Sequence, residues 1–387
     1  PKRMKICLLG LDNLPVLAPE YREHTIGGES VQQTLLAQAL ARRGHEVSMV
    51  TADYGQTDAA LWEGIRVYKA YRPEAGLPLL RFVHPRWSGL WSALARADAQ
   101  LYYTSCAGMQ VGLLALFCAR HGRRFVFRCA SDADCDPSQL LIRYARDRWL
   151  YAYGLHRADA ILVQSAAQAR SLARHFDLPG RVAAMLVEPA PFYGERDIDV
   201  LWVANIRRVK RPDRVLALTH QLPEADIHMV GGPLPGEDAL YESIRRDAAL
   251  TPNLTFHGRM SYWDVNAVYA RARLLVNTSE VEGFPNTYLQ SWIRGVPVVS
   301  YIDPDGVIGR NGLGAVVESP AQMRDAILRL LGDPGALAAA SSRCRAFMVR
   351  EFAEEKILTP YLTTFDEVTR HSIHSARMLA TSDRRHV

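Results

Sequence analysis

Short apolar runs alternate with amphipathic segments of helical period along the first part of the chain. Residues 5–11 form the first apolar run, and residues 29–43 carry apolar side chains at intervals of three and four. Gly44 ends this predicted helix, and a second apolar run follows at residues 45–51. Because strands that alternate with helices pair in parallel and are covered on both faces, the pattern predicts an α/β protein.

The alternation of strands and helices occurs twice. The first series of predicted strands comprises residues 5–11, 45–51, 65–71, 99–105, 123–130 and 158–165. The second series comprises residues 197–205, 225–232, 253–259, 272–279 and 296–302. Residues 187–197 are rich in proline, glycine and charge and are predicted to form a linker. The sequence thus predicts two Rossmann-like parallel-sheet domains that face a cleft, with the first over residues 1–190 and the second over residues 198–345.

Composition narrows the class of protein. The 387 residues are 48% hydrophobic and 22% charged, which is enough to bury more than one core. No segment reaches the roughly 18 consecutive apolar residues of a membrane span, so we expect a soluble, cytoplasmic protein. The six cysteines lack paired metal spacing and are predicted to be reduced, buried thiols. A net charge of +5 is mild and does not indicate a nucleic-acid partner.

Residues 81–96 interleave apolar and basic side chains. Phe82, Trp87 and Trp91 alternate here with arginines, so the helical part could rest on an anionic membrane surface. The alternative, which we favour, is a core-packed helix with a solvated basic side.

The segment EGFPNTYLQSW, residues 282–292, is the most informative for function. It places Glu282 and a helix N-terminus at the carboxyl ends of parallel strands, where open α/β sheets bind ligands. Unpaired N–H groups near Asn286 and Thr287 suit an anion such as a diphosphate, while the carboxylate can accept hydrogen bonds from sugar hydroxyls. The segment therefore predicts a nucleotide-sugar site.

The loop after the first strand lacks the GxGxxG fingerprint of dinucleotide-binding proteins. About 15 residues intervene before Gly27 and Gly28 at the start of the helix, which disfavours NAD. A glycine pair at a helix N-terminus lets a ligand approach the backbone closely.

The segment beginning at Glu282 resembles the signature of the retaining glycosyltransferases of family four, which have the two-domain GT-B fold. That signature carries two acidic residues with seven residues between them, whereas here Gln290 holds the second position. The resemblance implies that Glu282 contacts the transferred sugar and Gln290 the ribose, to which glutamine adds hydrogen bonds but no charge. Pro285, where many relatives have glycine, removes one backbone donor.

Residues 203–213 are similar to the segment that delivers two cations to the diphosphate in this family. Asn205 holds the position of the family's arginine and Lys210 that of its lysine, so Arg207 or Arg208 must supply the second cation. Cations aimed at the developing charge of the leaving group lower the barrier.

The resemblance implies further donor and catalytic contacts. Asp132 is the candidate where many relatives have a histidine, and a helix over residues 346–375 is expected to cross back onto the first domain. The remaining predicted donor-binding residues are Gly27, Gly28, Gly232, Arg259, Met260 and Phe284.

Aspartates spaced as DxD occur in residues 132–136 and 303–305 and mimic the metal motif of the other glycosyltransferase fold. We predict no metal, because GT-B enzymes generally use helix ends and basic side chains instead, although clustered carboxylates do suit hard cations.

The resemblance implies a retaining, metal-independent hexosyltransferase without a cofactor, whose co-substrate is a UDP- or GDP-linked sugar. The acceptor would be a saccharide or a lipid-linked intermediate of polysaccharide biosynthesis at the inner face of the membrane. Two alternatives remain open: a nucleotide-sugar 2-epimerase, and a catalytically silent nucleotide-sugar-binding subunit, which would explain Gln290, Asn205 and the missing histidine together.

Overall fold

The computed structural model describes residues 3–24, 26–77, 80–190, 195–234 and 236–382, with side chains described through residue 370. The chain divides into two compact units. Unit 1 comprises Pro1–Tyr21, Glu29–Leu186 and Glu355–Val387, and unit 2 comprises Arg22–Gly28 and Val187–Glu354. A short segment of the amino-terminal half thus belongs to the second unit.

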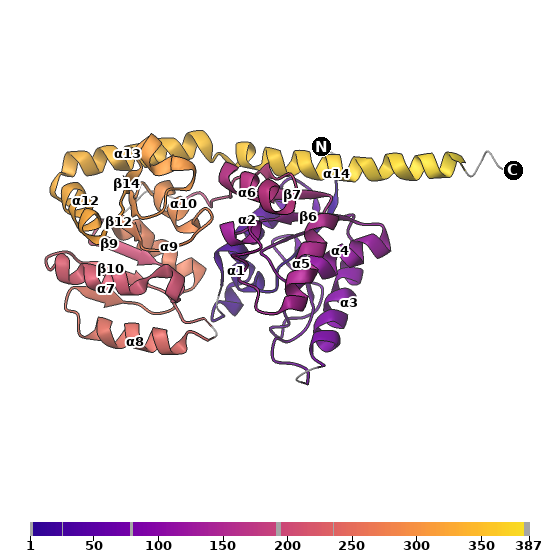
Figure 1. Ribbon diagram of the computed structural model, residues 1–387, viewed down its shortest axis with the longest axis horizontal. Coiled ribbons are helices and arrows are strands. Elements are labelled where there is room, and N and C mark those ends of the chain that lie inside the picture. The colour runs from indigo at the N-terminus through magenta and orange to yellow at the C-terminus, as the bar shows by residue number, and fades with distance from the viewer. Residues whose placement is uncertain (1–2, 25, 78–79, 191–194, 235, 383–387) are drawn as a thin grey trace. The chain divides into compact units, whose positions relative to one another are not determined.

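Unit 1 is built on a sheet that has eight strands within the described residues, in the order β3-β4-β2-β1-β5-β6-β7-β8. Of these strands, β6 and β7 are labelled in Figure 1. All neighbours pair in parallel except β3 and β4. The strands are β1 (Lys5–Leu9), β2 (Glu46–Thr51), β3 (Ala60–Trp62), β4 (Ile65–Lys69), β5 (Leu101–Ser105), β6 (Arg124–Arg128), β7 (Ala160–Val163) and β8 (Arg181–Val182).

Helices connect these strands, and their apolar faces cover the sheet. The predicted apolar residues of α2, among them Val31, Leu35 and Leu40, are buried. Gln32 and Gln33 are buried as well, so the helix is covered on more than one side. The helical elements of unit 1 are α1 (Leu14–Leu17), η1 (Pro19–Tyr21), α2 (Gly28–Arg42), η2 (Phe82–Trp87), α3 (Ser88–Ala97), α4 (Met109–His121), η3 (Asp132–Cys135), α5 (Ala145–Arg157), α6 (Ala166–Phe176) and α14 (Glu354–Ser382).

Unit 2 contains a second sheet, which has six strands in the order β11-β10-β9-β12-β13-β14 within the described residues, all parallel. Its strands are β9 (Ile198–Val203), β10 (Ile227–Val230), β11 (Leu254–Phe256), β12 (Ala272–Asn277), β13 (Val298–Ser300) and β14 (Gly314–Val316). Its helical elements are η4 (Arg208–Lys210), α7 (Pro212–Gln221), α8 (Asp238–Ala249), α9 (Tyr262–Arg271), α10 (Asn286–Ile293), η5 (Pro304–Gly306), α11 (Val307–Asn311), α12 (Pro320–Gly332) and α13 (Pro334–Glu351).

Each sheet has one point where the strand order reverses. In unit 2 the chain moves from β9 outward to β11 and then returns to β12 on the other side of β9. In unit 1 the same reversal lies between β1 and β5. Open parallel sheets bind ligands outside the carboxyl ends of strands at such a point. The loops after β9 and β12 are therefore the expected position of a site in unit 2.

Every predicted strand is present, although each is shorter at its ends than the apolar run that predicted it. Strands β3, β8 and β14 were not predicted. Strand β8 has only two residues, which are too few to show a period. Of the predicted linker, residues 191–194 lie outside the described residues.

The predicted boundary at residue 345 falls inside α13, which continues to Glu351. Unit 2 extends to Glu354, because Phe347 in α13 packs against Trp292 of α10 with ring centroids 5.6 Å apart. Helix α14 begins at this boundary and belongs to unit 1 from Glu355 onward. Its Tyr361 Oη donates to the backbone oxygen of Ala184 at 3.0 Å.

None of the helices within the described residues is long and apolar enough to cross a membrane.

Candidate functional site

The reversal point of unit 2 holds a partly buried ion pair between two adjacent strand ends. Lys210 ends the turn η4 after β9, and its Nζ donates to Oε1 of Glu282, which lies in the loop after β12. The Ser279 hydroxyl donates to the same carboxylate oxygen at 2.8 Å. The side chains of Lys210 and Glu282 are 12% and 16% exposed. Two residues that the sequence placed in different motifs thus meet at one point.

Further hydrogen bonds tie the loop after β9 to the loop after β12. The Glu280 N–H donates to the Val209 oxygen at 2.9 Å, and the Thr278 hydroxyl donates to the Lys210 oxygen at 2.8 Å. The buried Trp202 in β9 donates its indole N–H to Thr278 Oγ1 at 2.9 Å. These bonds fix both loops, so the ammonium and the carboxylate are held in place before any ligand arrives.

Burial and a neighbouring cation both disfavour the charged form of Lys210. Burial lowers its pKa, Glu282 partly opposes that shift, and the nearby Arg207 guanidinium lowers the pKa further. The Arg207 Nε atom is buried and has no hydrogen-bond acceptor among the described residues, whereas Arg208 is exposed. Of the two arginines that the sequence left open, Arg207 is the one whose charge acts on Lys210. Two cations and one carboxylate leave a net positive charge that suits an anion.

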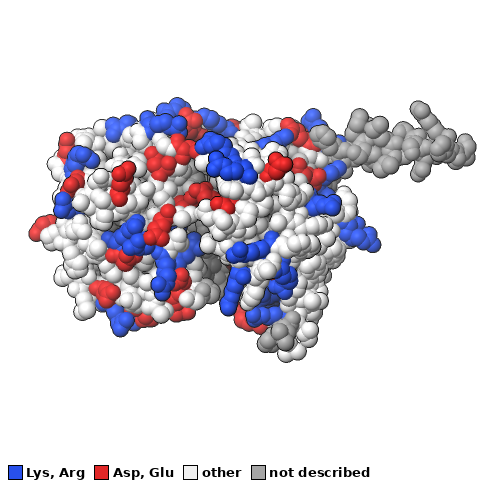
Figure 2. All heavy atoms as spheres, viewed as in Figure 1, with Lys and Arg blue, Asp and Glu red and all other residues white. Residues whose placement is uncertain are grey.

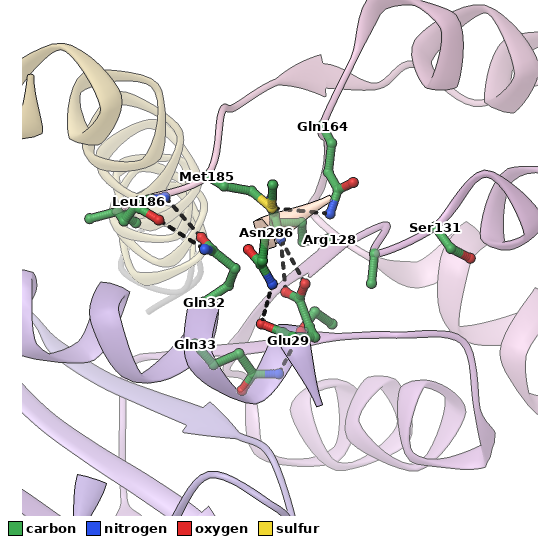
Figure 3. Close-up of polar contacts among 12 residues, drawn as sticks. Glu29, Gln32, Gln33, Arg128, Ser131, Gln164, Met185, Leu186 and Asn286 are labelled. Carbon is green, nitrogen blue, oxygen red and sulfur yellow. Dashed lines mark hydrogen bonds and ion pairs between the residues drawn. The ribbon is translucent and has the colours of Figure 1, made fainter. Parts of the chain in front are cut away.

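Two asparagines of the predicted donor site bind the backbone around the glycine pair. Asn286 Nδ2 donates to the Gly28 oxygen at 2.6 Å (Figure 3). Asn205 Nδ2 donates to the Ile26 oxygen at 3.1 Å. A Cβ atom at Gly28 would lie 2.4 Å from Asn286 Nδ2, whereas one at Gly27 would meet nothing within 4 Å. Any other residue at position 28 would therefore displace the Asn286 amide, which approaches closely from α10.

The loops after β10 and β11 also meet. The Gly231 N–H donates to the Gly258 oxygen at 2.9 Å, and Arg259 lies over Gly232, where an added Cβ would be 2.8 Å from its Nε. Met260, the next residue, is half-buried. The predicted donor residues of these loops thus line the same edge of the sheet as Lys210.

Helix α10 begins at Asn286, with Thr287 in its first turn. Pro285 precedes it in extended conformation and provides no side-chain cap, so the first-turn N–H groups are suited to an anion. The Phe284 ring instead packs among aromatic rings, with its centroid 6.3 Å from Tyr288 and 6.2 Å from Trp292. Phe284 therefore anchors the loop to the core of unit 2.

Asp132 lies in unit 1, in the turn η3 after β6. It is exposed, and its Oδ1 accepts from Gln168 Nε2 at 3.0 Å. The neighbouring Asp134 is buried and accepts from the N–H of Ala130 at 2.7 Å and from the Ser131 hydroxyl at 3.1 Å. Burial raises the pKa of Asp134 to about 6, although these hydrogen bonds oppose the shift.

Sequence reasoning missed a buried ion pair in unit 1. Arg128, at the end of β6, is fully buried, and its Nη1 donates to both carboxylate oxygens of Glu29 at 2.8 and 3.0 Å (Figure 3). Glu29 lies in the first turn of α2, directly after the glycine pair. The signal in the sequence was an arginine inside an apolar strand, because a buried charge requires a partner.

One aspartate of each DxD string serves local backbone structure. Asp303 accepts from the N–H groups of Ile308 and Gly309 at 2.7 and 3.1 Å and so begins α11, as Asp134 does for η3. The described residues contain no group of three or more histidine, cysteine or acidic side chains that could hold a metal ion.

Two family models match this chain. The model described as "Glycosyl transferase 4-like domain" matches residues 27–187, and the model described as "Glycosyl transferases group 1" matches residues 197–333. Only residues 188–196 separate the two matches. The fold and both matches define a glycosyltransferase of the GT-B class, and the chain belongs to its family-four type.

Individual relatives agree with this assignment. The D-inositol 3-phosphate glycosyltransferase of Mycobacterium leprae is 27% identical over 263 residues, which are 64% of this chain and 60% of that protein. This chain thus spans about 60% of the length of the curated relatives it matches.

Solved structures share the fold. Sucrose-phosphate synthase from Thermosynechococcus elongatus has a TM-score of 0.72 at 18% identity and covers 98% of this chain and 100% of its own. Anabaena HepE, solved in complex with UDP and glucose, has a TM-score of 0.71 at 15% identity and covers 94% of this chain and 100% of its own. The predicted fold class is confirmed.

Proposed function

We propose that this glycosyltransferase is a retaining hexosyltransferase that uses a nucleoside-diphosphate sugar, with UDP or GDP as the nucleotide. The observation that carries the proposal is the Lys210–Glu282 pair at the reversal point of the second sheet, with Arg207 beside it. HepE, a structural neighbour, has been solved with UDP-glucose, which supports a donor of this class.

In the proposed reaction, Lys210 and Arg207 bind the diphosphate while Glu282 accepts hydrogen bonds from hydroxyls of the sugar. The bond from the anomeric carbon to the β-phosphate oxygen breaks, and the electron pair stays on the diphosphate. The acceptor hydroxyl attacks from the same face and loses its proton to that phosphate. Its oxygen then holds the sugar, and the nucleoside diphosphate leaves with the proton.

The protein's own cations supply the charge that the leaving group needs. A largely buried ammonium and a half-buried guanidinium act strongly on a diphosphate because little water screens them. We propose that the reaction therefore needs neither a cofactor nor a metal, and expect transfer to continue in EDTA.

The donor site is tested by thermal unfolding with UDP, GDP, ADP and CMP and with their sugar conjugates. A ligand at one hundred times its dissociation constant stabilises the folded state by about 2.7 kcal/mol. We expect one nucleotide class to raise the melting temperature of wild type and of Arg329→Ala, which removes an exposed charge on α12. Lys210→Ala should lose this shift. The absence of a shift with every nucleotide would overturn the proposal.

A second candidate is a nucleotide-sugar-binding subunit without turnover. It is favoured by Asn205, which is bonded to the backbone oxygen of Ile26, and by Gln290, which is bonded to Arg294. Binding without release of nucleoside diphosphate, across a panel of saccharide and lipid-linked acceptors, would favour this subunit over the transferase.

We propose further that the enzyme works at the cytoplasmic face of a membrane, on a lipid-linked or saccharide acceptor of polysaccharide biosynthesis. Helix α3 does not carry this contact, because its Leu90 and Leu94 are buried, as in the core-packed alternative. Exposed apolar side chains lie instead in two neighbouring segments, which Arg146 joins by lying 3.4 Å over the Phe82 ring. The exposed apolar side chains of the two segments are Leu77, Leu80, Val83, Leu141, Tyr144 and Trp149.

These apolar side chains are interspersed with the exposed Arg81, Arg143 and Arg146. In Figure 2, basic side chains also gather on the part of unit 1 where Figure 1 labels α5. Apolar side chains among basic ones fit an anionic lipid surface. We expect the protein to sediment with phosphatidylglycerol vesicles more than with phosphatidylcholine vesicles.

The double variant Leu80→Ser and Val83→Ser should lose most of the vesicle binding. Leu250→Ser, which removes an even more exposed leucine from unit 2, should keep it. Equal binding to both vesicle types, or an equal loss of vesicle binding in both variants, would overturn the proposed membrane contact.

A further inference from the structure

The amide of Gln290 is held within the protein in a fixed orientation. Its Oε1 accepts from Arg294 Nη1 at 3.1 Å, and its backbone oxygen accepts from the same nitrogen at 2.9 Å. Arg294 Nη2 in turn donates to Asn266 Oδ1 at 3.0 Å. Both Gln290 and Arg294 are buried. Because Arg294 takes the amide oxygen, Gln290 offers mainly N–H donors to a ligand, whereas a ribose diol requires acceptors for its two hydroxyl protons.

A carboxylate lies close to Gln290 on a different segment of unit 2. Tyr262, the first residue of α9, donates its hydroxyl hydrogen to Oε2 of Glu188 at 2.9 Å. Burial raises the pKa of Tyr262, and Glu188 raises it further, while hydrogen bonds with Gln290 and Asn266 oppose the shift. The Tyr262 hydroxyl thus lies between Glu188 and Gln290. Glu188 is also close enough to Arg294 to act on its charge.

Glu188 is free to bind a ligand in a way that Gln290 is not. It is half-buried, and its second oxygen, Oε1, makes no hydrogen bond or ion pair within the described part of the chain. One carboxylate oxygen is therefore oriented by a rigid tyrosine and the other remains available. Residue 188 also lies in the short interval between the two family matches, so neither match accounts for it.

We propose that Glu188 is the residue that binds the ribose of the donor nucleotide, with Tyr262 positioning its carboxylate, in place of the acidic residue that Gln290 replaces. This inference rests on the proposed function. An ionised carboxylate accepts from hydroxyl groups about twice as strongly as a neutral amide oxygen does. Tyr262 directly follows residues 257–261, the loop after β11, and Gln290 lies one turn into α10. Glu188 therefore lies beside two segments of the predicted donor site.

The test compares ribonucleotides with their 2′-deoxy counterparts on the full chain. Isothermal titration gives dissociation constants for UDP and 2′-deoxy-UDP, and for GDP and 2′-deoxy-GDP. Wild type should prefer the ribonucleotide by about tenfold or more, because a hydrogen bond to a charged group is lost in the deoxy compound. Glu188→Gln should lose most of that preference while binding the deoxynucleotide as wild type does, which also shows that the variant is folded.

Two further variants separate positioning from direct contact. Tyr262→Phe should reduce the preference for ribose in part, because the carboxylate stays but is no longer oriented. Gln290→Ala should keep it. An unchanged preference in Glu188→Gln, no preference in wild type, or loss of preference in Gln290→Ala alone would overturn the role of Glu188 and leave the proposed function standing. Failure of wild type to bind either nucleotide pair would instead overturn the proposed function, and this inference with it.

Discussion

The carboxyl edges of the two sheets share a topology but use their polar residues differently. In unit 1, Asn13 Nδ2 donates to Gln33 Oε1 at 3.0 Å and Gln33 bonds to Ser105, between the ends of β1 and β5. The pair of Arg128 and Glu29 lies nearby in the same unit. In unit 2, the equivalent edge holds Lys210, Arg207 and Glu282, whose charges do not cancel. We therefore propose that the same reversal of strand order serves folding in one unit and ligand binding in the other.

The polar groups of the two units differ in how they affect the stability of the folded state. In unit 1 the buried charges are paired, which rigidifies a fold, although Asn13 Oδ1 and Arg128 Nε have no hydrogen-bond partner among the described residues. A lysine whose pKa is lowered by burial and by a neighbouring arginine is held at a cost in stability, which a bound anion would relieve. Polar groups in unit 1 should consequently control the free energy of unfolding, and those in unit 2 the affinity for the donor.

The largest expected effect is on the buried ion pair of unit 1. Arg128→Ala leaves the Glu29 carboxylate unpaired and should lower the free energy of unfolding by about 3–5 kcal/mol. Equilibrium urea unfolding, followed by hydrogen exchange of peptides from β6, reports on this unit. Arg329→Ala, an exposed arginine on α12, is the control and should change the free energy of unfolding by less than about 0.5 kcal/mol.

Nucleotide binding by Arg128→Ala tests whether the sheet edge of unit 1 takes part in binding the ligand. Where Arg128→Ala remains folded, its stabilisation by the nucleotide that binds wild type should persist, because Lys210 and Glu282 are unchanged. A variant as stable as wild type that has lost nucleotide binding would break the comparison and place Arg128 in the ligand site.

The sequence predicted those parts of the molecule that follow from local periodicity. The strands long enough to show a run of apolar residues were predicted, whereas β8, with only Arg181 and Val182, was not. Lys210 and Glu282 were both predicted, because each lies in a motif at a strand end. The bonding of Asn205 to Ile26 could not be predicted, since it joins residues that are far apart in the chain and depends on the tertiary fold.

The partners of Gln290 and Arg128 escaped prediction for a related reason. A sequence shows that a residue type departs from a pattern, as glutamine does at position 290 and arginine does in β6. It does not show which side chain compensates, because Arg294, Glu188 and Glu29 reach these positions through side-chain directions that no spacing encodes. The structure is therefore most informative at departures from a motif, because it identifies the side chain that compensates.

The smallest expected effect in this comparison concerns Asp134, the buried carboxylate of unit 1. Its pKa of about 6 in the folded state exceeds the ordinary value of 3.8. Between these two pH values the folded chain holds a proton that the unfolded chain has released, so stability falls as pH rises from about 4 to about 6. Relative to Asp134→Asn, which does not titrate, wild type should lose about 3 kcal/mol of unfolding free energy across this window.

The measurement is urea unfolding at several pH values, again followed in β6 peptides. Ser131→Ala removes a hydrogen bond that lowers the pKa of Asp134, so it should move the midpoint of the loss to higher pH. The affinity for the nucleotide should show no corresponding change between wild type and Asp134→Asn over the same range. A pH dependence of binding that disappears in Asp134→Asn would show instead that this edge of unit 1 takes part in the reaction, and the division of roles between the two sheets would fail.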